Sequence, residues 1–263
     1  MKQSISDRKR NLIIAISLGV FTIALSLALY LGGVYLQPLA RVRALAETIL
    51  RNTYNPLNTT LTSYSLNAVS AVIWDYRGVD TVFETTVLLA SIIGITHLLN
   101  TTKWVDKGVK NQTSLVAKFS TRLIVVITTL IAISTAVHGH LTPGGGFQAG
   151  AMLTVIIALI VPVFSINFIY MHGLRKDKML YSRYFILLLI TLTALSPVLL
   201  TPLIGNAYIM QNQVKEDSSF SMPAWFMDTP LGGSIFFYNV LEAFAIALAL
   251  SYALLLLLEY RTE

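Results

Sequence analysis

The chain has 263 residues, of which 55% are hydrophobic and only 12% are charged, and its mean hydropathy is +0.67. Soluble domains carry about 25% charged residues, so this composition excludes a water-soluble globular protein. The sequence contains no cysteine, which excludes disulfides, thiolate metal sites and cysteine-ligated iron–sulfur clusters within this chain.

Six apolar segments are long enough to cross a bilayer, which takes about 20 residues in a helix. We predict spans at residues 11–36, 79–99, 119–137, 147–171, 184–203 and 233–258. A seventh apolar stretch, residues 64–74, is about half the required length and predicts an interfacial or re-entrant helix. The expected fold is an all-α integral membrane protein with about six transmembrane helices and this one short additional helix.

Charged residues gather in the connections between the predicted spans. Basic residues concentrate in the N-terminal tail and after the second and fourth spans, the last group being Arg175, Lys176, Lys178 and Arg183. Because cytoplasmic loops are enriched in Lys and Arg, this alternation predicts that both termini are cytoplasmic. It also accounts for the net charge of +6 without a nucleic-acid partner. Arg41, Arg43 and Arg51 conflict with this topology, since they follow the first span on the predicted outer side.

The most polar connection between spans, residues 103–118, divides the chain into two parts. We predict a two-span segment at residues 1–105 and a four-span module at residues 106–263. No internal repeat is visible, although repeats are common in self-contained secondary transporters.

Carboxylates are rare inside membrane spans, where they usually serve function or pair with another charge. Asp80 and Glu84 are four residues apart and therefore share a helix face. Glu84 lies more than one turn into the second predicted span, where a carboxylate could bind and release H⁺ or Na⁺. Alternatively, Asp75 or Asp80 pairs with Arg77 at the interface, and Asp80 caps the helix.

A third acid, Glu242, lies near the middle of the last predicted span, with Asn239 three residues before it on the same face. A carboxylate at this depth must face protein, water or a partner rather than lipid. The sequence leaves open an ion-path role and a structural hydrogen bond to a neighbouring helix.

A glycine-rich break separates the third and fourth predicted spans. Its structural motif consists of Pro143, Gly144, Gly145, Gly146, Phe147 and Gln148. Proline stops a helix and glycines permit unusual backbone angles, while the free amides of the next helix point back at the turn. Such broken helix ends can line an ion path. His138 and His140, just before the motif, are either proton relays or interfacial residues of a tight turn, and alone they make a poor zinc site.

Residues 138–150 resemble the signature of the MnhB/MrpB family, a membrane component of Mrp-type multisubunit Na⁺/H⁺ antiporters. The same module occurs in archaeal membrane-bound hydrogenase and sulfane reductase complexes. The resemblance covers residues 113–263 and implies four spans there. Residues 75–88 are similar to the C-terminal part of MrpA, the large component of the same antiporters, with departures at Val79 and Phe83, where Phe and Gly are usual. The chain thus resembles a fusion of the two pieces.

The resemblance implies a non-catalytic membrane subunit of a cation/proton-translocating complex in the plasma membrane of a prokaryote. Its partners would be other Mrp-type membrane subunits and, in a redox-driven pump, hydrogenase-like peripheral subunits. Asp80 and Glu84 would lie on the ion route. No bound cofactor is expected, Na⁺ or H⁺ being the transported species. A structural spacer without its own ion path and a self-contained secondary transporter remain the alternatives.

Overall fold

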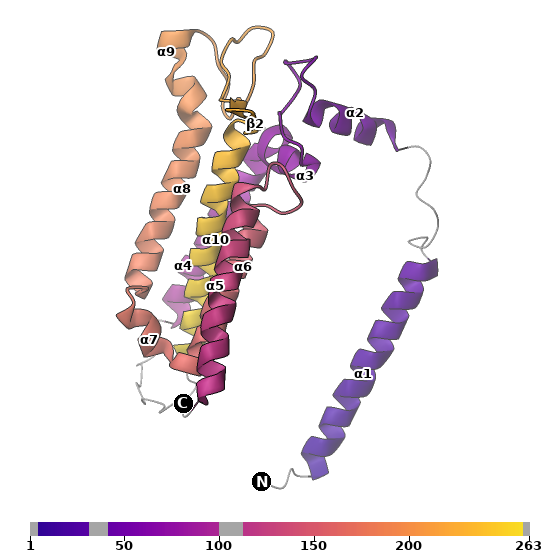
Figure 1. Ribbon diagram of the computed structural model, residues 1–263, viewed down its shortest axis with the longest axis vertical. Helices are drawn as coiled ribbons and strands as arrows, with labels where there is room; N and C mark the ends of the chain where they lie inside the picture. The colour runs from indigo at the N-terminus through magenta and orange to yellow at the C-terminus, as the bar shows by residue number, and fades with distance from the viewer. Residues whose placement is uncertain (1–4, 32–41, 100–112, 260–263) are drawn as a thin grey trace. The chain divides into compact units, whose positions relative to one another are not determined.

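The computed structural model describes residues 5–31, 42–99 and 113–259, and it is predominantly helical (Figure 1). Within these residues, six helices are long and apolar enough to cross a membrane, which confirms the predicted number of spans. They are Arg10–Leu29, Gly78–Leu98, Leu115–Val137, Gly146–Phe164, Lys176–Leu203 and Ser234–Leu258. The predicted boundary at residues 105 and 106 lies outside the described residues, as does Arg41.

The structure forms two units, Met1–Ala46 and Glu47–Glu263. The first contains helix α1, Ile5–Leu29, whose side chains are exposed from Arg10 onward. This helix is apolar on all sides, as expected of a helix surrounded by lipid or by other membrane helices.

The second unit is a bundle of five long helices, labelled in Figure 1. They are α4 (Gly78–Leu99), α5 (Leu115–Val137), α6 (Gly146–Phe164), α8 (Lys176–Leu199) and α10 (Ser234–Glu259). Helix α10 packs against each of the other four, and α5 also packs along α6. The bundle core therefore forms around the last span in the chain.

Short elements connect these helices. They are α2 (Ala44–Thr53), α3 (Ala68–Ala71), the π-helical turn η2 (Val72–Tyr76), α7 (Ile166–Met171), α9 (Thr201–Ile204) and an antiparallel hairpin of β1 (Trp225–Phe226) and β2 (Thr229–Pro230). The connections that precede α4, α6 and α10 meet at one end of the bundle, where Asn212 Nδ2 donates to the carbonyl oxygen of Ser63 at 3.1 Å. Consecutive spans of this unit therefore run in alternating directions.

The predicted short helix exists, but it covers Ala68–Tyr76 instead of residues 64–74. Asn67 caps its start by accepting a hydrogen bond from the Val69 amide, and Tyr64 has a positive φ of 51° outside the helix. Ala71 and Trp74 are completely buried, so this element is part of the bundle core.

The fourth and fifth predicted spans have different bounds in the structure. The prediction extends the fourth to residue 171, but α6 ends at Phe164 and α7 begins after Ser165, whose φ is 103°. Pro162 lacks an amide hydrogen and disturbs the last turn, so the helix is interrupted here. The fifth span begins at Lys176 and therefore includes Arg183, for which the sequence predicts a loop position.

Candidate functional site

The glycine-rich break between α5 and α6 is held by polar side chains of the segment that precedes α4. Asn67 Nδ2 lies 2.7 Å from the carbonyl oxygen of Gly139, 2.9 Å from that of Thr142 and 3.2 Å from that of Gly144. Ser70 Oγ donates to the same Gly139 carbonyl at 2.6 Å. These donors satisfy carbonyl groups that the interrupted helix leaves free.

The glycines of the break have two distinct roles. Gly144 has a φ of 130°, which favours glycine and makes the turn. Gly146 and Gly150, on one face of α6, permit the close approach of α10. A Cβ atom at Gly146 would lie 2.5 Å from Oε2 of Glu242, and one at Gly150 would lie 2.6 Å from the carbonyl oxygen of Ala243. The sequence indicates the turn but not this close packing.

Glu242 is therefore placed directly against the N-terminal end of α6. Its side chain is 4% exposed, and Asn239 on the same helix accepts a hydrogen bond from the Gly146 amide at 3.3 Å. The Phe147 amide and the Trp74 indole also interact with the carboxyl group. A helix N-terminus carries partial positive charge and free amide groups, so it attracts the carboxyl oxygens.

Glu84 lies in the same pocket as Glu242, which the sequence alone does not predict. The pocket has a volume of about 240 Å³ and is lined by Glu84, Thr85, Val87, Leu88, Ser91, Phe147, Glu242 and Ile246. The two acids come from α4 and α10, and their charges interact. Glu242 is buried, whereas Glu84 is exposed at the surface of the unit Glu47–Glu263. Among the described residues, no group of three or more acids and histidines is arranged to hold a metal ion.

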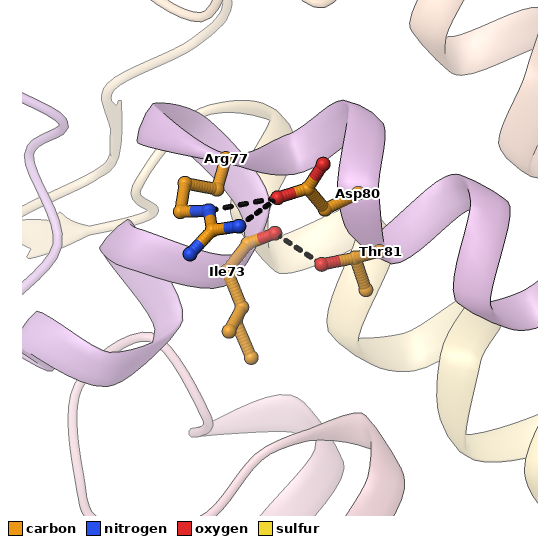
Figure 2. Close-up of polar contacts among 4 residues, drawn as sticks. All are labelled: Ile73, Arg77, Asp80 and Thr81. Carbon is orange, nitrogen blue, oxygen red and sulfur yellow. Dashed lines mark hydrogen bonds and ion pairs between the residues drawn. The ribbon is translucent and has the colours of Figure 1, made fainter.

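Asp80 pairs with Arg77, as Figure 2 shows. Its Oδ2 lies 2.7 Å from Nε and 2.5 Å from an Nη of Arg77, and both side chains are exposed. The next residue, Thr81, donates to the carbonyl oxygen of Ile73 at 2.6 Å and ties the start of α4 to η2. The interfacial pairing given above as an alternative thus occurs, with Asp80 as the acid. Its role on the ion path stays a prediction.

Asp75 lies on η2 beside the loop that connects α9 with α10. Burial raises its pKa to about 6, although the charge of Lys215 and a hydrogen bond from Asn212 act in the opposite direction. The carboxyl group therefore holds its proton to a higher pH than an ordinary aspartate does. The sequence pattern gives no sign that this acid is the more buried of the pair around Arg77.

The two histidines of the break lie in different environments. His138 is exposed, with its Nδ1 3.0 Å from the carbonyl oxygen of Ser134 in the same helix. His140 is 3% exposed, and its Nε2 donates to the carbonyl oxygen of Pro230 at 2.9 Å. Burial lowers the pKa of His140, which keeps the ring neutral at pH 7. His140 thus fixes the hairpin loop to the break.

Arg183 is a buried cation, so its predicted position in a cytoplasmic loop is wrong. The side chain is 2% exposed, and it donates to the carbonyl oxygens of Thr85 on α4 and Ala245 on α10. Within the described residues, no carboxylate forms an ion pair with it. Backbone carbonyls, which hydropathy cannot reveal, allow the guanidinium to be buried between three helices.

Comparison with known proteins identifies the family. A family model for a domain related to the MnhB subunit of Na⁺/H⁺ antiporters matches residues 116–252, more than half of the chain. The chain belongs to this MnhB-related family. The predicted Mrp-type relationship is therefore confirmed.

Individual relatives of this MnhB-related chain are distant. An uncharacterized protein of Methanocaldococcus jannaschii, MJ1307, is 29% identical over 125 residues, which are 41% of this chain and 48% of that protein. The chain thus spans about half the length of this relative.

Two solved structures share its fold. A chain of the membrane-bound sulfane sulfur reductase, an archaeal respiratory membrane complex, superposes with a TM-score of 0.64 and 20% identity over 94% of this chain and 100% of that chain. A chain of the Mrp complex from Dietzia sp. DQ12-45-1b superposes with a TM-score of 0.51 and 16% identity. The match covers 97% of this chain and 26% of that chain.

Proposed function

We propose that this chain is a membrane subunit of a multisubunit cation/proton-translocating complex, and that Glu84 and Glu242 form part of its ion path. The observation that carries the proposal is the single pocket that both carboxyl groups line. Two carboxylates from different spans, next to a helix N-terminus, can bind a proton or Na⁺ and release it again.

The exposure of Glu84 supports a multisubunit assembly. A carboxylate in a membrane span is too costly to leave against lipid, yet Glu84 is exposed on this chain and belongs to the span Gly78–Leu98. We propose that another chain of the complex, or water held by one, covers it. Relatives in an Mrp complex and in an archaeal respiratory complex support the same conclusion.

The proposed partners follow from these relatives. They are other Mrp-type membrane subunits in a prokaryotic plasma membrane, with peripheral redox subunits if the complex is a redox-driven pump. Since this chain has no cysteine, any cysteine-ligated iron–sulfur cluster would belong to a partner. The chain itself would contribute ion translocation and no redox catalysis.

Neutralising the two acids tests the ion path. In the intact complex, Glu84→Gln and Glu242→Gln should each lower cation-coupled proton flux in membrane vesicles by at least about tenfold, equivalent to about 1.4 kcal/mol of barrier. Asp177→Asn is the matched control, because it removes an exposed carboxylate from the first turn of α8, outside the pocket. Its flux should be unchanged.

Assembly has to be measured in the same preparations. If both glutamine variants assemble and transport at the normal rate, the acids are not on the ion path. The chain is then a structural spacer, a role compatible with the Arg77–Asp80 ion pair and the Asn67 contacts.

A further inference from the structure

Four buried polar atoms without hydrogen-bond partners occur together between η2 and α10. Within the described residues, these atoms are Trp74 Nε1, Tyr238 OH, Asn239 Nδ2 and Glu242 Oε2. Trp74, Tyr238 and Asn239 are completely buried. Because buried polar groups are nearly always satisfied by protein or by ordered water, four neighbouring exceptions indicate a place where water binds.

The four groups are contiguous in space. The rings of Trp74 and Tyr238 stack with centroids 4.6 Å apart and an angle of 11° between their planes. Tyr238 and Asn239 are four and three residues before Glu242, respectively, so all three share one side of α10. The Trp74 indole also lies near enough to the Glu242 carboxyl group to influence it, although the two groups do not form a hydrogen bond of normal geometry.

An acid lies at each end of this cluster. On η2, Asp75 follows Trp74, interacts with Tyr238 and has Asn212 and Lys215 of the α9–α10 loop as its other neighbours. At the opposite end, Glu242 shares its pocket with Glu84. The polar cluster therefore connects the end of the bundle at which the α9–α10 loop lies with the proposed ion path.

We propose that Trp74, Tyr238 and Asn239 bind ordered water and that this hydrated chain carries protons between Asp75 and Glu242. The proposal rests on the proposed function, because Glu242 must exchange a proton. The Asp75 carboxyl gives its proton to the first water, each water passes one of its own protons onward, and the Glu242 carboxylate accepts the last. Each water molecule has the same composition after the transfer as before it. Transfers in the reverse direction return the two carboxyl groups to their initial protonation states.

The three residues contribute differently because of their hydrogen-bonding chemistry. The Tyr238 hydroxyl both donates and accepts, so it can pass a proton along the chain. The Trp74 indole and the Asn239 amide nitrogen only donate, so they orient water molecules through their oxygen atoms. Asp75 can supply the proton to the first water molecule, because burial raises the pKa of its carboxyl group to about 6.

Tyr238→Phe tests the relay, since it keeps the stacked ring and removes the hydroxyl. In vesicles containing the intact complex, the proton flux should fall by about tenfold, the effect of losing one hydrogen-bonded link. The ratio of rates in H₂O and D₂O should also rise, because proton transfer then limits the rate. Tyr252→Phe is the matched control. It removes a hydroxyl from the same helix, where Thr96 is its partner outside the cluster, and it should leave both values unchanged.

Asp75→Asn provides a second, independent variant at the edge of the cluster. It should lower the flux as Tyr238→Phe does, and the double variant should be no slower than either, because both interrupt one chain. Normal flux in both assembled single variants, together with an inactive Glu242→Gln complex, would overturn the relay and leave the proposed function standing. Normal flux in Glu242→Gln would instead overturn the proposed function.

Discussion

At the scale of single residues, burial and backbone contacts determine which polar groups are available for chemistry. Asp80 and His138 are exposed and have partners in their own segment. Glu242 is buried and Asp75 is half-buried, and the fold places both beside other polar groups. From the sequence alone, these four residues are comparable candidates for an ion path. Their surroundings in the fold distinguish them.

His140 gives a prediction at this scale that depends on pH. Because burial lowers the pKa of His140 in the folded protein, the unfolded chain takes up a proton more readily below pH about 6.5. The stability that comes from burying the neutral ring is therefore complete above that pH and is lost as the pH falls through the folded pKa, because the buried site disfavours the charged ring. The thermal unfolding temperature should decrease between pH 8 and pH 5.5.

His140→Gln is the comparison variant, since an amide can still donate to the Pro230 carbonyl but does not titrate. Its unfolding temperature should change less over the same pH range. An equal decrease in both proteins would mean that other groups cause the pH dependence.

At the scale of helix pairs, the contact of α6 with α10 depends on glycine. Gly146→Ala should destabilise the protein by about 1–3 kcal/mol, the usual cost of overpacking, because the added methyl group meets Glu242. Thermal unfolding of the purified chain in detergent measures this change.

Gly94→Ala is the matched control in a helix of the same bundle. Nothing lies within 4 Å of a Cβ atom at this position, so alanine should be neutral or stabilising by up to about 1 kcal/mol. Equal effects of the two substitutions would show that Gly146 is not needed for close packing.

Helix contacts also explain what the sequence could and could not predict. The number of spans was predictable, because the length of an apolar segment is a local property. The meeting of Glu84 with Glu242 was not, since hydropathy does not say which helices pack together. The prediction for Arg183 was wrong for a related reason: the carbonyl groups of Thr85 and Ala245 that receive it belong to distant segments.

At the scale of the whole molecule, the surface of the helix bundle is the feature that bears on assembly. Glu84, on the span α4, is exposed at the surface of the unit Glu47–Glu263. A self-contained transporter would cover its intramembrane acid with its own helices. The proposal of a multisubunit complex rests on this exposed acid.

The purified chain alone should therefore be inert. Reconstituted in vesicles, it should move neither Na⁺ nor H⁺ above the leak of empty vesicles when a pH gradient is applied, whereas the intact complex should. Transport by the isolated chain that Glu84→Gln abolishes would identify it as a self-contained transporter.

The burial of Arg183 has a consequence for biogenesis. Helix α8 leaves the ribosome before α10, so the Ala245 carbonyl that receives the guanidinium does not yet exist when α8 reaches the insertion machinery. A lone arginine in lipid is costly. We therefore expect α8 to stay near the water interface or the translocon until α10 has been synthesised, and the five-helix bundle to close in a single late step.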